Sequence, residues 1–461
     1  MFADSHAHLN HKDYEGDIEI VADRLNRENF LVLNVAYDLE SGEKAISLAH
    51  QYGFMKASVG VHPHDAESVT EADLKKLREL AKDRNVVAIG ETGLDYFRNK
   101  SPRDSQEKIL IEHLKVANEN GKPVIIHCRD AFEEIVPILK EHFNPEYGGV
   151  LHCFSEGADE AKRGEDLGFY ISFAGNVTYK KADKLREAAA VVTPERLLIE
   201  TDAPYLAPQS QRGKRNEPLF LKETAKFLAE LRGVTVSDIA RLTNTNYRKL
   251  FLGVDKPDKA EIVYWIRDSL YVNVTRGCTN NCTFCNREEA PLVQGHFLGL
   301  DKDPEFDEII NSIGDSRPSE LVFCGFGEPT MRLELVKKVA SWAKGKNLKT
   351  RLNTNGHGNL IHGRDIVPEL AGLIDVASIS LNAHDSETYN RLCKPTIPEG
   401  CFEAVLDFIG RCKNILPDTV ATAIGLPEPN REGFDLEKTR KLAEELGVRF
   451  RVRPFNMVGQ G

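Results

Sequence analysis

The sequence predicts two α/β domains in tandem, a (β/α)8 barrel followed by an open partial (βα)6 barrel. The first observation is the length, because 461 residues exceed one compact core and suit two or three domains. The second is that residues 1–252 alternate eight apolar β-type runs with helical patterns, whereas residues 266–461 contain six such runs. The third is the polar stretch 253–261, whose Gly253 and Pro257 predict a linker over residues 253–265.

The eight runs of the first domain predict the strands of a closed parallel barrel. In chain order they read FADSHAHL, LVLNVAYD, ASVGVHPH, VVAIGETGLD, PVIIHCRD, GVLHCFSE, YISFAGNV and LLIETDAP. Helix signals lie between them: Thr70 and Asp73 form a capping-box pattern, and a helix from about Ser105 is stopped by Gly121 and Pro123.

The second series of runs predicts strands of an incomplete barrel. They read SLYVNVTR, ELVFCGFG, LKTRLNTN, DVASISLN, TVATAIGL and RFRVRPFN, with helical stretches between them such as DLEKTRKLAEEL, which Gly447 closes. Six units are too few to close an eightfold barrel, so we expect an open one.

Composition excludes several classes of protein. The chain is 41% hydrophobic and 28% charged, and no apolar run approaches the roughly 18 residues of a membrane helix. The beginning lacks a secretory leader pattern, and nine cysteines, an odd number, argue against a disulfide framework, so we expect a cytoplasmic protein. Because the net charge is -11, any nucleic acid would have to be held by local cations or metal ions.

Polar side chains of the ligand type stand at the ends of the predicted barrel strands. They are His6, His8, Glu91, His127, His152 and Asp202. Strand ends converge on one face of a parallel barrel, and imidazoles with carboxylates suit zinc, manganese or magnesium. Six ligands are enough for two ions that share a carboxylate, an arrangement that activates water for phosphodiester cleavage.

Four further residues lie beside these ligands. Cys128 and Cys153 each follow a ligand histidine, and strand alternation predicts that they point to the opposite face as buried packing residues. His62 and His64 end the third strand, where a substrate contact and a structural turn around Pro63 are equally compatible with the sequence.

The loop QRGKRNEP, residues 211–218, follows Asp202 and precedes a helical run. Its cations Arg212, Lys214 and Arg215 predict a substrate phosphate site at the helix N-terminus, with a solvated charged loop as the alternative.

The motifs DSHAHL, GVHPH, GETGLDY, HCRDA, HCFSE, ETDAPYLAP and RGKRNEP together resemble those of the TatD-family metal-dependent deoxyribonucleases, over residues 1–252. The resemblance implies two ion positions that share Glu91, one with His6, His8 and Asp202 and the other with His127 and His152. It also implies that Asp202 orients or deprotonates the attacking water and that DNA or another nucleic acid is cleaved from an end. The barrel and the ligands alone equally permit amide or lactone hydrolysis.

The segment TRGCTNNCTFCNR places Cys278, Cys282 and Cys285 within eight positions. A structural zinc site needs four protein ligands, whereas a [4Fe-4S] cluster with three leaves one iron open. The spacing therefore favours a cluster. A zinc site stays the alternative, because a distant cysteine could add a fourth ligand, and the candidates are Cys324, Cys393, Cys401 and Cys412.

The second predicted strand of this domain ends in CGFGEPT. Gly325 and Gly327 would let the backbone approach a ligand, and Glu328 would meet an ammonium group, with a plain tight turn as the alternative. Asn353 begins NTNG after the third strand, and Ser380 after the fourth is a weaker candidate for a cofactor contact.

The cysteine triad, the GFGEP turn and NTNG resemble motifs of the radical SAM superfamily, over residues 266–461. The resemblance implies that S-adenosyl-L-methionine binds the open iron and is cleaved reductively to a radical that abstracts a substrate hydrogen. It implies an electron donor such as flavodoxin or ferredoxin. The chain is thus expected to be a bifunctional fusion of a TatD-type nuclease with a TatD-associated radical SAM protein. The alternative is an amidohydrolase-type barrel with a zinc-stabilised module that binds nucleic acid.

Overall fold

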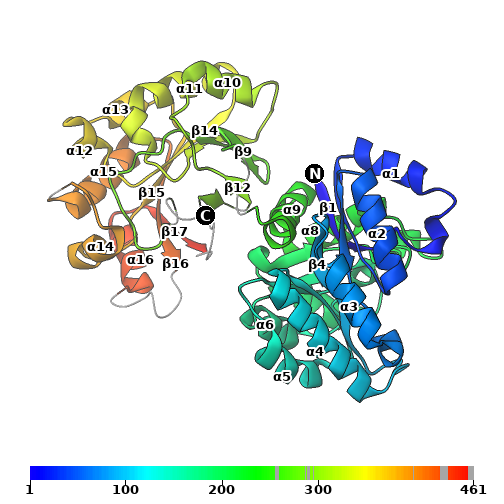
Figure 1. Cartoon of the computed structure of the whole chain (residues 1–461). Coiled ribbons are helices and arrows are strands. Elements are labelled where there is room, and N and C mark those ends of the chain that lie inside the picture. The colour runs from blue at the N-terminus through cyan, green and yellow to red at the C-terminus, as the bar shows by residue number, and fades with distance from the viewer. Residues whose placement is uncertain are drawn as a thin grey trace. The chain divides into compact units, whose positions relative to one another are not determined.

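The computed structural model describes residues 1–254, 259–285, 287, 291–293, 295–397, 399–425 and 434–454. The chain divides into two compact units, Met1–Asp255 and Lys256–Gly461 (Figure 1). No helix in the described ranges is long and apolar enough to cross a membrane.

The N-terminal unit is a ring of eight parallel strands in sequential order, with helices outside it (Figure 1). The strands are β1 (Phe2–Ala7), β2 (Phe30–Asn34), β3 (Met55–Val59), β4 (Val86–Asp95), β5 (Val124–Arg129), β6 (Gly149–Leu151), β7 (Phe169–Phe173) and β8 (Leu197–Ile199). Backbone bonds from Asp202 N to His6 O (2.9 Å) and from His8 N to Ala203 O (2.7 Å) close the ring. The predicted (β/α)8 TIM barrel is confirmed.

The α-helices of this unit follow its strands. They are α1 (Ile18–Arg27), α2 (Leu39–Gln51), α3 (Glu71–Leu80), α4 (Arg103–Asn120), α5 (Phe132–His142), α6 (Ala158–Asp166), α7 (Asp183–Val191), α8 (Leu221–Arg232) and α9 (Val236–Leu252). Thr70 and Asp73 form the capping box of α3, and Gly121 ends α4 in the left-handed region.

Two apolar layers hold the barrel. Alternate strand residues such as Val124 and Ile126 pack outward against the helices, whereas Ile125 points inward. Tyr247 and Phe251 of α9 join the inward layer. Because this apolar layer fills the lower part of the barrel, polar side chains are confined to the carboxyl ends of the strands.

His113 of α4 ties this helix to the turn that carries His62. Its Nδ1–H donates to Ile109 O (2.7 Å), and its Nε2 accepts from Val61 N (2.9 Å). Both bonds need the neutral imidazole, and burial lowers the pKa of His113 to about 4.

The barrel is therefore expected to lose stability in acid through His113. The unfolded chain binds this proton near pH 6.5 and the folded chain only near pH 4, so the free energy of unfolding should fall as the pH drops through that window. The free energy of unfolding should fall by about 3 kcal/mol across this window. Denaturant titrations followed by circular dichroism should show a shallower pH dependence for His113→Gln than for wild type, and equal slopes would contradict the assignment.

The C-terminal unit is an open sheet of seven strands in the order β17-β16-β15-β14-β13-β10-β9. Its strands are β9 (Val263–Ile266), β10 (Ser269–Asn273), β13 (Glu320–Cys324), β14 (Lys349–Thr354), β15 (Val376–Ser380), β16 (Asp418–Gly425) and β17 (Arg449–Pro454), and β11 (Leu292–Val293) pairs with β12 (His296–Phe297). The six strands from β10 to β17 in this sheet are parallel, as predicted for a partial barrel.

Helices cover one face of this sheet. They are α10 (Phe306–Ile313), α11 (Leu333–Gly345), α12 (Gly358–His362), α13 (Val367–Leu370), α14 (Ser386–Cys393), α15 (Cys401–Ile415) and α16 (Leu436–Glu445). Leu321, Leu352 and Ala377 point from the strands into this helical layer. The opposite face carries the polar side chains of the same strands.

Strand β9 was not predicted. The sequence places residues 253–265 in a linker, but Val263–Ile266 pair antiparallel with β10. Four residues at a sheet edge give too short a pattern to separate from a polar connection. Residues 255–258 of the predicted linker lie outside the described residues.

Candidate functional site

Four imidazoles and two carboxylates meet at the carboxyl end of the barrel. Glu91 lies where the register between β4 and β5 shifts, so its side chain turns into the barrel. Gly93 lets β4 approach β5, since a Cβ there would lie 1.9 Å from His127 O. His6 lies near the end of β1 and His8 directly follows it, at the point where the ring closes against Asp202.

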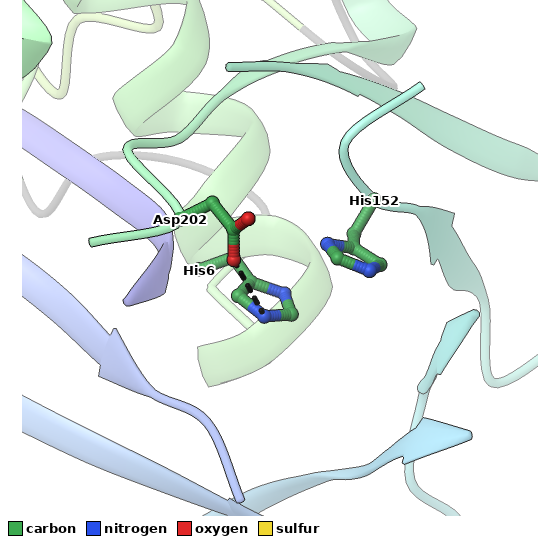
Figure 2. A group of neighbouring side chains, drawn as sticks. All are labelled: His6, His152 and Asp202. Atoms are coloured by element: carbon green, nitrogen blue, oxygen red, sulfur yellow. Dashed lines mark ion pairs between the residues drawn. The ribbon is translucent and has the colours of Figure 1, made fainter. Parts of the chain in front are cut away.

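One oxygen of Glu91 faces the ends of β1 and β8. Glu91 Oε2 lies 3.4 Å from His6 Nε2, which is 3.2 Å from His8 Nε2. His8 Nε2 lies 3.3 Å from Asp202 Oδ1, and the His6 ring stacks on His152 at 4.0 Å between centroids (Figure 2). These atoms form one position for a cation.

The other oxygen of Glu91 faces a second set of imidazoles. Glu91 Oε1 lies 2.8 Å from His152 Nε2, 2.9 Å from His127 Nδ1 and 3.4 Å from His62 Nε2. The carboxylate therefore stands between two groups of nitrogen ligands, and the donor set fits two borderline divalent ions. His62 lies in the ligand cluster itself.

Burial and charge act on these groups together. Burial alone would raise the pKa of Glu91, but His152, His62 and His127 outweigh it and hold that pKa well below its ordinary value. Burial would likewise lower the pKa of His152, yet Glu91 and Glu200 raise it well above the ordinary range. The carboxylates thus stay ionised and favour positive charge between them.

The three cysteines of the C-terminal unit lie on a loop after β10. Its backbone is fixed by bonds from Thr283 N to Leu392 O (2.8 Å) and from Asn281 N to Cys393 O (3.0 Å). Cys278 Sγ accepts from Asn280 N (3.4 Å) and Asn355 Nδ2 (3.8 Å).

The cysteine loop differs from the barrel site in the distances between its ligand atoms. Within the described ranges, the groups of three ligand atoms that lie within 4.8 Å of one another all belong to the barrel. Such spacing suits a single ion, whereas a multi-iron cluster separates its thiolates more widely. N–H donors to sulfur, as at Cys278, are the contacts that tune iron–sulfur clusters, so the loop fits a cluster.

Comparison with known families assigns both units. The profile described as TatD related DNase matches residues 3–252, more than half of the chain. The chain belongs to the TatD related DNase family. The Radical SAM superfamily profile matches residues 272–442, so the second unit of this TatD-family chain is a radical SAM domain.

Several TatD relatives span the barrel only. The metal-dependent hydrolase YabD of Bacillus subtilis is 42% identical over 252 residues, which are 54% of this chain and 99% of that protein. The 3'-5' ssDNA/RNA exonuclease TatD of Escherichia fergusonii is 38% identical, over 46% of this chain and 84% of its own length. The crystal structure of the TatD homologue YjjV of Escherichia coli matches with 32% identity and a TM-score of 0.52, over 54% of this chain and 98% of its own.

Two carboxylates that the sequence analysis missed orient the imidazoles of the TatD barrel. Asp95 Oδ2 lies 2.8 Å from His64 Nε2 and 3.2 Å from His127 Nε2. Glu200 Oε1 accepts from Cys153 N (2.7 Å) and lies 3.3 Å from His152 Nδ1. Asp95 stands four residues after Glu91 within β4, and this spacing was a signal in the sequence. Glu200 is two residues before Asp202, but both lie beyond the end of β8 at Ile199, so strand alternation does not identify it.

The variant Asp95→Asn is expected to lower divalent metal affinity and hydrolysis roughly 10- to 100-fold, because an amide cannot hold both His64 and His127 in place. Metal titration followed by calorimetry and initial rates would measure the two effects. Asp104→Asn, an exposed change at the start of α4, is the control. Wild-type metal affinity in Asp95→Asn would contradict the orienting role.

A cavity of about 730 Å³ opens over the ligands of the TatD barrel. Besides the ligands, its lining includes Arg98, Lys100, Arg129 and Tyr205. Cys128 packs against the outer apolar layer, as predicted, although it also reaches the cavity lining. Cys153 lines the cavity and its Sγ accepts from Asn176, so the prediction that it points away from the ligand face is wrong. Strand β6 ends at Leu151, and the alternation does not extend to Cys153, whose φ is 43°.

The basic loop after Asp202 does not line this cavity. Arg215 forms ion pairs with Asp17 (2.6 Å) and Glu217 (3.2 Å) and packs on the Tyr14 ring, so acids already neutralise it, and its phosphate role stays a prediction. Lys214 is exposed and donates to Gln211 Oε1 (2.9 Å). Arg212 lines a neighbouring groove instead.

Glu328 of the radical SAM domain bonds to its own chain. The carboxylate is 2% exposed and accepts from Thr330 N (3.0 Å), Thr330 Oγ1 (2.6 Å), Thr354 Oγ1 (2.7 Å) and Asn355 N (2.6 Å). Oε1 accepts three of these bonds and Oε2 one, so the carboxylate is held against its own chain, and its contact with an ammonium group stays a prediction.

The remaining candidates of the radical SAM domain lie near the loop. A Cβ at Gly327 would lie 2.0 Å from Thr275 O, so this glycine lets the GFGEP turn pack on the segment before Cys278. Gly325 has φ +126° and abuts Asn273. Asn353 Nδ2 donates to Cys324 Sγ (3.3 Å), and Ser380 Oγ accepts from Arg453 (3.0 Å), so both face the helix-free side of the sheet.

Proposed function

We propose that the barrel hydrolyses phosphodiester bonds of single-stranded DNA or another nucleic acid with two divalent ions, zinc, manganese or magnesium. The position of Glu91 between two sets of imidazoles carries the proposal, because it supplies one shared ligand and two separate positions. Two such ions supply Lewis acidity toward the phosphate. The Escherichia fergusonii relative is named as a 3'-5' ssDNA/RNA exonuclease, and this supports the substrate class.

The chain's own groups have distinct roles in this proposal. His6, His8, His127, His152, Glu91 and Asp202 hold the ions. Asp202 is 14% exposed against 4% for Glu91, so it is the carboxylate more open to the cavity. Burial would raise the pKa of Asp202, but His8 and His6 hold it below its ordinary value, and the ionised group can accept a proton from water.

The hydrolase proposal is tested with a substrate panel. Protein supplied with each metal is incubated with a labelled single-stranded oligonucleotide, an amide and a lactone. We expect metal-dependent release of nucleotides. Cleavage of the amide or lactone with an intact oligonucleotide would instead assign a small-molecule amidohydrolase.

For the second unit we propose that Cys278, Cys282 and Cys285 bind a [4Fe-4S] cluster and that S-adenosyl-L-methionine binds beside it. The cluster and cofactor together supply one-electron reductive chemistry, and flavodoxin or ferredoxin would be the electron donor. The Cys282 thiol contacts Cys393. This contact and burial raise the pKa of the Cys282 thiol well above its ordinary value. The odd number of cysteines in the sequence, nine, supports a reducing cytoplasmic location.

Anaerobic reconstitution with iron and sulfide tests this second proposal. We expect a brown protein that cleaves S-adenosyl-L-methionine under reduction and a colourless Cys282→Ala variant. A wild-type protein that stays colourless and holds only zinc would assign the zinc-stabilised module.

A further inference from the structure

A second hollow adjoins the cavity over the metal ligands. We name it the basic groove; it has a volume of about 650 Å³ and is lined by Tyr179, Lys180, Lys181, Lys184, Gln209 and Arg212. Ser155 and Asn176 line both hollows. The groove is therefore continuous with the cavity in which hydrolysis would occur.

The basic groove is strongly cationic. Lys180, Lys181 and Arg212 are exposed, and no carboxylate in the described part of the chain lies within ion-pair distance of them. Lys184 differs, because Glu156 pairs with it at 2.9 Å. In a chain of net charge -11, three uncompensated cations along one groove form a local anion-binding surface.

Hydrogen bonds fix the walls of the basic groove. Thr178 Oγ1 accepts from Gln209 N (2.8 Å), and Tyr179 donates to Ala207 O (3.0 Å), which joins the segment after β7 to the segment after β8. The Arg212 guanidinium lies 4.5 Å from the Tyr179 ring centroid. Arg212 is thus held above the groove by stacking, and no acid neutralises it.

The junction between the two hollows offers a free acceptor. Asn176 Oδ1 is buried and has no hydrogen-bond partner among the described residues, while its Nδ2 donates to Cys153 Sγ (3.9 Å). A buried amide oxygen without a donor costs free energy, which a bound sugar hydroxyl or base amino group would recover. Tyr205, 51% exposed at the cavity, gives an aromatic face on which a base can stack.

We infer that the basic groove binds the sugar-phosphate backbone of a single-stranded nucleic acid whose end lies over the metal ligands. The inference rests on the proposed function and adds the course that the nucleic-acid strand takes on the protein. Lys180, Lys181 and Arg212 contact phosphates beyond the scissile bond, and Asn176 contacts the nucleotide at the junction. A substrate shorter than the path does not reach the cations.

Binding and hydrolysis measured separately test the groove. The groove variant is Lys180→Ala/Lys181→Ala/Arg212→Ala. The control variant, Lys75→Ala/Lys82→Ala/Arg84→Ala, removes the same three charges from an exposed region at α3 that lines neither hollow. The probe is a fluorescent single-stranded oligodeoxynucleotide of roughly twelve nucleotides, bound in EDTA and followed by anisotropy over a range of salt concentrations.

The groove variant should bind the oligonucleotide roughly tenfold more weakly than wild type, with the slope of log Kd against log salt reduced by about 2. The control variant should match wild type in binding and in the hydrolysis of bis(p-nitrophenyl) phosphate with manganese. Equal Kd values and salt slopes for the two variants would overturn the inference. Failure of wild type to hydrolyse either substrate would reject the proposed function, and the Kd comparison would still decide on the groove.

Discussion

Glu91→Gln is expected to lower hydrolysis by about 10³-fold or more and to deplete bound divalent metal. The carboxylate faces His6 with one oxygen and His152 and His127 with the other, so an amide places an N–H₂ donor in one of the two ion positions. It also removes the negative charge that the buried imidazoles surround. Initial rates on a single-stranded oligonucleotide and metal content by mass spectrometry would measure both effects.

The control for this change is Glu79→Gln, an exposed position of α3. It should keep the wild-type rate and metal content. A Glu91→Gln protein that retains both ions and its activity would show that the shared carboxylate is not a ligand. Circular dichroism would establish that the variant is folded.

Glu328→Ala is expected to destabilise the radical SAM domain by about 3 kcal/mol. Removing the carboxylate leaves the N–H groups of Thr330 and Asn355 buried without an acceptor. Glu328→Gln should cost less, because one oxygen remains. Trp265 and Trp342 are the two tryptophans of the chain and both belong to this domain, so denaturant titration by tryptophan fluorescence reports its unfolding.

Glu387→Ala, an exposed change on α14, is the matched control and should unfold like wild type. One outcome would distinguish a structural role of Glu328 from a role in cofactor binding. If Glu328→Gln kept wild-type stability and weakened only the binding of S-adenosyl-L-methionine, the carboxylate would contact the cofactor.

The barrel and its ligands were predictable because two simple regularities act together. Parallel strands direct their carboxyl ends to one face, and residues two apart on a strand share a side, which suffices to group His6 and His8 with Asp202. The same regularity could have included Asp95. It fails for Cys153, which follows the end of a short strand.

Charged residues outside the strands were harder to assign. Arg215 and its partner Asp17 are 198 residues apart, so the sequence shows a cation without showing what neutralises it. For Glu328, the sequence shows a carboxylate without showing which groups it contacts. A glutamate in a glycine-rich turn can face a ligand or its own backbone, and only the structure shows its burial and its four internal donors.

The cysteine loop has a consequence for the order in which the protein is made. Thr283 bonds to Leu392, and Thr396 N donates to Thr279 O (2.8 Å), so the loop is held by residues more than 100 positions later. A ribosome that has just finished the loop has not yet made its supports. On the proposal that these thiols bind a cluster, their arrangement is complete only after α14 has been synthesised, and cluster insertion would follow synthesis of most of the domain.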